Sequence, residues 1–129
     1  MYSTTISLYL PGSKGLDLQR LSATTLARAC RDNDTAVRLG GEEFALLFAG
    51  IDAVKAQLGA NRLLGILNEQ SVEGVENITV SVGLAACPDH ANSERTLYAA
   101  SDRALYVAKN SGRKRMAVAP LIQENLPGI

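Results

Sequence analysis

The chain has 129 residues, which is enough for one domain with a single hydrophobic core. Its 13 basic and 13 acidic residues cancel, so the charge balance gives no reason to expect nucleic acid or an acidic membrane surface as a partner. No apolar run is long enough to span a membrane, and no signal peptide is evident. We expect Cys30 and Cys87 to be free, buried thiols in a reducing cytoplasm, and the single histidine, His90, to lie on the surface.

The first part of the chain predicts a strand and a helix joined by a short loop. Residues 4–10 alternate well enough for a strand with its apolar side chains on one face, and Pro11-Gly12 ends it. Residues 16–31 carry apolar side chains at helical spacing and predict an amphipathic helix. The strand and loop, residues 1–15, contain neither Asp nor Glu.

A hairpin follows. Two short β-compatible runs, residues 35–39 and 44–48, flank Gly40-Gly41, and glycine tolerates the positive φ angles of a tight turn. Glu42 and Glu43 come directly after the glycines. Two adjacent carboxylates suit a hard cation such as Mg²⁺, which takes one or two carboxylates plus phosphate oxygens. An ordinary hairpin with a solubilising acidic tip would have the same pattern, so the spacing alone leaves both interpretations open.

The rest of the chain predicts two helices and two strands. Asp52 marks the start of a helix that runs to about residue 68, and residues 78–86 are apolar and β-branched, as in a central strand buried on both faces. Residues 116–119 are expected to form an edge strand before a tail at 120–129. The alternation of helices and strands predicts an α/β fold with a central mixed β-sheet flanked by helices. The last long helix, at 93–110, is expected to bury Leu97, Ala100, Ser101, Ala104, Val107 and Ala108.

Four ordered motifs resemble one family. Gly40-Gly41-Glu42-Glu43-Phe44 resembles the signature of the GGDEF family, the diguanylate cyclases that join two GTP into cyclic di-GMP. Arg31-x-x-Asp34 resembles the product-binding inhibitory site of that family, at its usual offset from the hairpin. Thr79-Val-Ser-Val-Gly83 and the segment from Ala100 to Arg113 match two further blocks. The chain is identified as a member of this family over about residues 16–119, and we expect one domain, residues 1–129, with a divergent or truncated start at 1–15.

The resemblance implies the palm-like fold of nucleotidyl cyclases, a bacterial cytoplasmic signalling role, and a reaction assisted by two Mg²⁺ or Mn²⁺ ions in a homodimer with one GTP per domain. Glu42 and Glu43 would be catalytic metal ligands, and Gly40-Gly41 would let the nucleotide approach the backbone. Lys109 and Arg113 would hold the triphosphate. Their ordinary interpretation is that cations at a helix end complement the helix dipole.

The resemblance also implies an inhibitory site at Arg31 and Asp34, with Arg62 near the position of an extra arginine. A guanidinium plane stacks on a purine, and a carboxylate accepts the N1 and N2 protons of guanine. Each residue has an ordinary interpretation as well: Arg31 favours the negative end of a helix, Asp34 shapes a turn, and Arg62 is a solvated side chain. Binding is preferred for Arg31 and Asp34, and for Arg62 the two interpretations stay equal.

The start of the chain departs from the family. Family members carry an Asp-x-Asp segment after the first strand, whose first aspartate is a metal ligand, and then an Asn and an Asp that read guanine. Residues 1–15 offer no counterparts. We therefore expect a degenerate GGDEF domain that binds cyclic di-GMP, or merely a partner, as a regulatory module. The alternatives are an active cyclase whose missing ligand comes from elsewhere, and a purely structural dimerisation domain.

Overall fold

The computed structural model describes residues 3–9, 30, 32, 34–40, 42–69, 80–112 and 115–122. Several expected features lie outside these residues: most of the helix at 16–31 with Arg31, the second glycine of the hairpin (Gly41), residues 78–79, Arg113, and the tail beyond residue 122.

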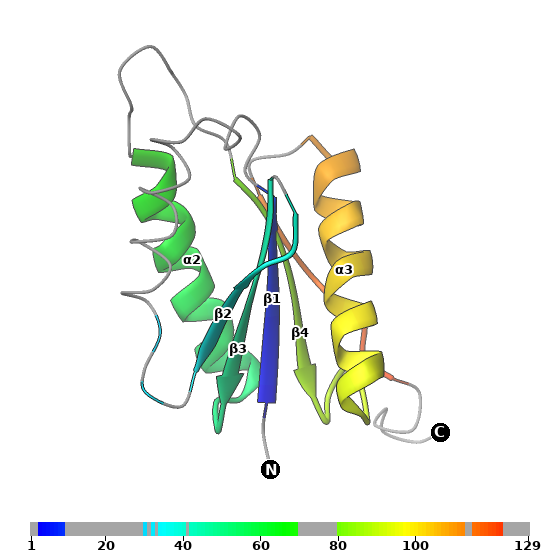
Figure 1. The fold of residues 1–129 in the computed structure, drawn as a ribbon. Coiled ribbons are helices and arrows are strands. Elements are labelled where there is room, and N and C mark those ends of the chain that lie inside the picture. The colour runs from blue at the N-terminus through cyan, green and yellow to red at the C-terminus, as the bar shows by residue number, and fades with distance from the viewer. Residues whose placement is uncertain are drawn as a thin grey trace.

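The centre of the molecule is a mixed five-stranded sheet with the order β2-β3-β1-β4-β5 (Figure 1). Neighbouring strands are antiparallel except for β4 and β5, which are parallel. Helices α2 and α3 cover opposite faces of the sheet (Figure 1), so the predicted α/β architecture is confirmed. The elements are β1 Ser3–Tyr9, β2 Thr35–Arg38, β3 Glu43–Ala49, α2 Ala53–Glu69, β4 Ser81–Cys87, α3 Glu94–Asn110 and β5 Met116–Val118.

Both described helices begin at polar residues that satisfy their first backbone N–H groups. Asp52 Oδ1 accepts a 2.9 Å hydrogen bond from the backbone N of Lys55, as expected for the residue that starts α2. At α3, the Ser93 hydroxyl accepts from the backbone N of Thr96 at 3.2 Å, and the Thr96 hydroxyl accepts from the backbone N of Ser93 at 3.1 Å. This reciprocal pair is a capping box, and it fixes where α3 begins.

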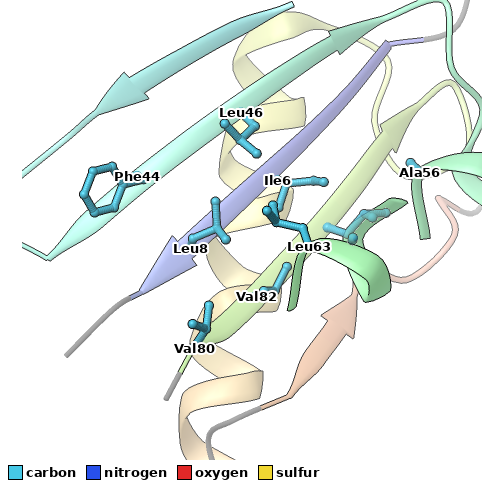
Figure 2. Close-up of a cluster of buried hydrophobic side chains, with 10 residues drawn as sticks. Ile6, Leu8, Phe44, Leu46, Ala56, Leu63, Val80 and Val82 are labelled. Atoms are coloured by element: carbon cyan, nitrogen blue, oxygen red, sulfur yellow. The ribbon is translucent and has the colours of Figure 1, made fainter. Parts of the chain in front are cut away.

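The larger part of the core lies between the sheet and α2. Alternate residues of β1, β3 and β4 point to this face, and they meet the buried stripe of α2 (Figure 2). Val80, directly before β4, is fully buried here, and every residue from 81 to 86 is buried as well, so the expected burial of this strand on both faces is confirmed. The buried members are Ile6, Leu8, Phe44, Leu46, Ala56, Ala60, Leu63, Val80, Val82 and Leu84.

The opposite face is covered by α3, which packs unusually close to the sheet through small residues. The hydroxyls of Ser7 in β1 and Ser101 in α3 share a buried 2.9 Å hydrogen bond. A Cβ on Gly83 of β4 would overlap the backbone N of Leu105 and the carbonyl O of Ser101. Glycine is therefore required at this position so that the helix and the strand can touch backbone to backbone.

Three sequence expectations are corrected. Val107 is 53% exposed, and Leu105, at 2%, takes its place in the buried stripe of α3, because the helical period carries the stripe from Ala104 to Leu105 and Ala108. His90 is buried, not on the surface, because its ring turns back to the end of β4. The cysteines are free, as expected, but both are only half-buried.

Within the described part of the chain, no helix is both long and apolar enough to cross a bilayer.

Candidate functional site

The tip of the β2–β3 hairpin is the first part of the candidate site. The backbone N atoms of Leu39 and Gly40 both donate to the carbonyl O of Glu43, at 2.9 and 3.4 Å. Arg38 Nε donates to the carbonyl O of Gly40 at 3.0 Å, which ties the side chain to the tip. The hairpin is confirmed, but the expected positive φ is not found at Gly40. A Cβ on Gly40 would meet nothing within 4 Å, so open space rather than backbone strain distinguishes this glycine.

Glu43 begins a row of side chains that crosses three strands. The register places Tyr9 of β1 directly opposite Glu43 of β3, and Ser81 of β4 directly opposite Tyr9. Directly opposite residues point to the same face of a sheet. That face is the one covered by α3, because Ser7, two residues before Tyr9, reaches Ser101 of α3. Glu43, Tyr9 and Ser81 therefore lie side by side beneath α3.

The last turn of α3 brings a cation to this row. Lys109 Nζ lies 4.0 Å from the centroid of the Tyr9 ring, a cation–π contact. In Figure 1 the end of α3 and the turn of the hairpin lie at the same, upper end of the sheet. Glu43 and Lys109 are thus both neighbours of Tyr9, at the end of the sheet where Gly40 and Glu42 form the hairpin tip, and their role toward a nucleotide stays a prediction. Gly41 and Arg113 lie outside the described residues.

The hydroxyl of Tyr98 on α3 is also affected by the negative charge of Glu43. Burial raises the pKa of the Tyr98 hydroxyl, and the negative charges of Asp102 and then Glu43 raise it further. The hydroxyl therefore keeps its proton at neutral pH. The sequence reading did not single out Tyr98, which lies on α3 far along the chain from the hairpin.

The carboxylates that the structure describes at the hairpin do not by themselves fit a pair of metal ions. Glu42 and Glu43 provide carboxylates, but the described residues contain no group of three or more His, Cys, Asp or Glu that could hold a metal. The position opposite Glu43 on β1 is an aromatic ring with an ammonium group over it. Like charges repel at short range, so an ammonium group beside the site disfavours a second cation.

Sequence reasoning missed Tyr9 as a residue of this end of the sheet. The signal that could have found it is the alternation of β1: Ile6 and Leu8 face the core under α2, so Tyr9 must face the other way. Its partner on β3 depends on the strand register, which local sequence does not fix.

Asp34 lies at the opposite end of the hairpin. Its Oδ1 accepts a 3.3 Å hydrogen bond from the backbone N of Ala49, which links the start of β2 to the end of β3. This bond gives Asp34 a structural role across the two strands and not in a local turn, and a carboxylate accepts several hydrogen bonds, so a ligand role for Asp34 stays a prediction. Burial raises the pKa of the nearby Cys30 thiol, and the Asp34 charge raises it further, which keeps that thiol protonated.

Arg62 lies on α2 with its side chain exposed to solvent. Its neighbour Leu63 and the preceding Ala60 are buried against the sheet. The exposure agrees with the ordinary interpretation of Arg62, and its role toward Asp34 stays a prediction.

Comparison with known proteins places this geometry in a family. The family model "Diguanylate cyclase, GGDEF domain" matches residues 17–115. The chain is 32% identical to diguanylate cyclase A of Treponema denticola over 106 aligned residues. The aligned region covers 79% of this chain and 28% of that protein. It is 36% identical over 109 residues to diguanylate cyclase DgcM of Escherichia coli K12, covering 83% of this chain and 26% of that protein. The chain thus spans about a quarter of the length of the curated relatives it matches.

Solved structures agree in fold. The GGDEF domain of DgcB from Caulobacter crescentus, in complex with c-di-GMP, superposes with a TM-score of 0.77 at 25% identity, covering 91% of this chain and 77% of that one. The active GGEEF domain of a diguanylate cyclase from Vibrio cholerae gives a TM-score of 0.82 at 23% identity, covering 95% and 85%. With the family model, the curated relatives and the fold in agreement, the chain belongs to the GGDEF family of cyclic di-GMP signalling.

Proposed function

We propose that this domain is a regulatory GGDEF module that binds cyclic di-GMP through Arg31 and Asp34 and makes little or none of it. One observation carries the second part of the proposal, the weak or absent synthesis: the residue opposite Glu43 on β1 is Tyr9, with Lys109 Nζ 4.0 Å from its ring. The reaction of the family needs two metal ions to offset the charge of the phosphates. A ring and an ammonium group supply no ligand for the second ion.

The binding part of the proposal rests on chemistry at the other end of the sheet. Asp34 lies beside Ala49, whereas Glu43 begins the same strand, so about 20 Å of β3 separates the two ends. A ligand at Asp34 would therefore leave the hairpin tip uncovered. The related DgcB domain was solved in complex with c-di-GMP, which supports this ligand class for the fold.

Calorimetry with cyclic di-GMP tests the binding site. We expect the wild type to bind and Arg31→Ala to lose binding, because the guanidinium group that stacks on the base is gone. Asp34→Asn should weaken binding while the amide oxygen still accepts from Ala49 N and preserves the link between β2 and β3. Arg62→Ala measures the contribution of the extra arginine.

Arg95→Ala is the matched control, since Arg95 is an exposed arginine of α3 with no predicted role. It should bind like the wild type. Absence of binding by the wild type, or equal binding by the wild type and Arg31→Ala, would overturn the proposed site and leave a structural dimerisation domain as the better interpretation.

A second candidate function is an active cyclase, with Mg²⁺ or Mn²⁺ bound at Glu42 and Glu43 and one GTP in each domain of a homodimer. It is favoured by the position of Glu43 and Lys109, each of which lies beside Tyr9 at one end of the sheet. Its decisive measurement is the turnover of GTP to cyclic di-GMP.

A further inference from the structure

Tyr9, the residue opposite Glu43, is held in place by its neighbours in the sheet. It is the last residue of β1, and it is paired on both sides, with Glu43 of β3 and Ser81 of β4. The ring is half-buried, and so is the Lys109 side chain that lies over it. The contact between the Lys109 ammonium group and the Tyr9 ring is therefore partly shielded from solvent.

The position of Lys109 is fixed by the packing of α3. Ser101, two helical turns before Lys109, is hydrogen-bonded to Ser7, two residues before Tyr9. Between them, the backbone of Leu105 lies against Gly83. These two contacts hold the helix in register with β1, so the ammonium group reaches the Tyr9 ring with little further ordering of the chain.

We propose that Tyr9 decides which cation lies beside Glu43: by holding the Lys109 ammonium group over its ring, it replaces a divalent metal ion with a cation of the chain itself. The ammonium group offsets the negative charge of the glutamate pair, and it repels a further cation. The same ring occupies the place from which a third carboxylate could point toward Glu43. The hairpin end is therefore closed to divalent metal by two side chains, one from β1 and one from α3.

Manganese binding tests this inference on the full chain. Free Mn²⁺ is followed by electron paramagnetic resonance during a titration, and the wild type is expected to bind poorly. Tyr9→Asp adds a carboxylate directly opposite Glu43 and removes the ring under Lys109, so its affinity for Mn²⁺ should rise at least about tenfold, since the number of charged ligands sets the affinity for hard cations. Lys109→Met keeps the apolar stem and removes the charge, and it should raise the affinity by a smaller factor.

Two controls separate metal ligation from general charge. Tyr9→Asn removes the ring as Tyr9→Asp does but adds no charged ligand, so its affinity for Mn²⁺ should rise by no more than the smaller factor expected for Lys109→Met. Val54→Asp places an acid on the exposed start of α2, away from the hairpin, and should leave the affinity of the wild type unchanged. Thermal melting of each variant verifies that it is folded.

The inference falls if the wild type binds Mn²⁺ as tightly as Tyr9→Asp. It also falls if a folded Tyr9→Asp and a folded Lys109→Met both bind no better than the wild type. The measurement is independent of cyclic di-GMP binding at Arg31 and Asp34, so the binding part of the proposed function can fail while this inference holds, and the reverse.

Discussion

His90 Nδ1 accepts a 2.9 Å hydrogen bond from the backbone N of Ala86, and the backbone N of His90 donates to the carbonyl O of Ala86 at 2.7 Å. The two bonds close the turn that leads from β4 toward α3. Because Nδ1 accepts, the imidazole is neutral and carries its proton on Nε2. Burial lowers the pKa of His90, and the nearby charge of Asp89 offsets part of that effect.

This hydrogen bond predicts a pH-dependent stability. The folded state lowers the pKa of His90 below its ordinary value of 6.5, so the unfolded chain binds the proton more tightly. The stability that the neutral His90 side chain contributes is fully present above the ordinary pKa of histidine. It decreases as the pH falls from that value toward the pKa of His90 in the folded state. Urea unfolding at about pH 7.5 and about pH 5.5 should therefore give a lower free energy of unfolding at the acidic value.

His90→Asn is the matched control, because the amide Oδ1 lies close to the position of Nδ1 and accepts the same bond without titrating. Since His90 is the one histidine of the chain, the variant should lose most of the pH dependence in this range. An equal loss of stability in both proteins would show that other groups cause it.

The limits of sequence reading are visible in these residues. The hairpin was predictable because its signal, Gly40-Gly41, acts over a few neighbouring residues. The burial of His90 and the pairing of Tyr9 with Glu43 were not, because they depend on a turn and on a strand register that joins distant segments. A register shift of one residue would place Tyr9 on the other face of the sheet.

Gly83→Ala should destabilise the domain by about 1–3 kcal/mol or more, because its Cβ would lie 2.7 Å from Leu105 Cα and overlap the backbone of α3. Neither backbone can move without disturbing the Ser7–Ser101 hydrogen bond. Chemical denaturation measures the change in the free energy of unfolding.

Gly59→Ala is the matched substitution, on α2, where a Cβ would meet nothing within 4 Å. It should stabilise the domain by about 0.4–1 kcal/mol, since alanine has less backbone freedom to lose in a helix. If both glycine variants shifted the stability in the same direction, the close packing of α3 on β4 would be in doubt.

Val80→Asp should prevent folding. Val80 has an exposed fraction of 0% and packs in the core beneath α2. An unpaired buried charge costs several kcal/mol, against a total stability of about 5–15 kcal/mol. Circular dichroism and thermal melting should show an unfolded or aggregated chain.

The control for Val80→Asp is Val54→Asp, because Val54 is 69% exposed in the first turn of α2, which has no acidic residue. A negative charge there favours the positive end of the helix by about 0.3–1 kcal/mol, so this variant should melt like the wild type or slightly higher. Cooperative melting of Val80→Asp would place Val80 at an exposed edge.

The last prediction concerns catalysis: the chain should convert GTP to cyclic di-GMP very slowly or not at all. Glu42 and Glu43 give the hairpin two carboxylates, but Tyr9 and Lys109 stand where a further ligand would complete a metal site. Residues 1–15 contain no acid that could serve as the metal aspartate or read guanine. Poor orientation of the base and the phosphates by itself raises a reaction barrier by several kcal/mol.

Incubation with GTP and Mg²⁺ or Mn²⁺, followed by chromatography, measures this turnover, with DgcM of Escherichia coli assayed beside it as the positive control. The product should stay near background for the wild type and for Glu42→Gln alike. The hairpin glutamates alone cannot hold both metal ions against the charge of two triphosphates. Tyr9→Asp is the informative third sample, since it adds a carboxylate directly opposite Glu43 and still lacks the expected guanine readers. Turnover by the wild type within about tenfold of DgcM, abolished in Glu42→Gln, would restore the active cyclase and require a metal ligand from another part of the chain.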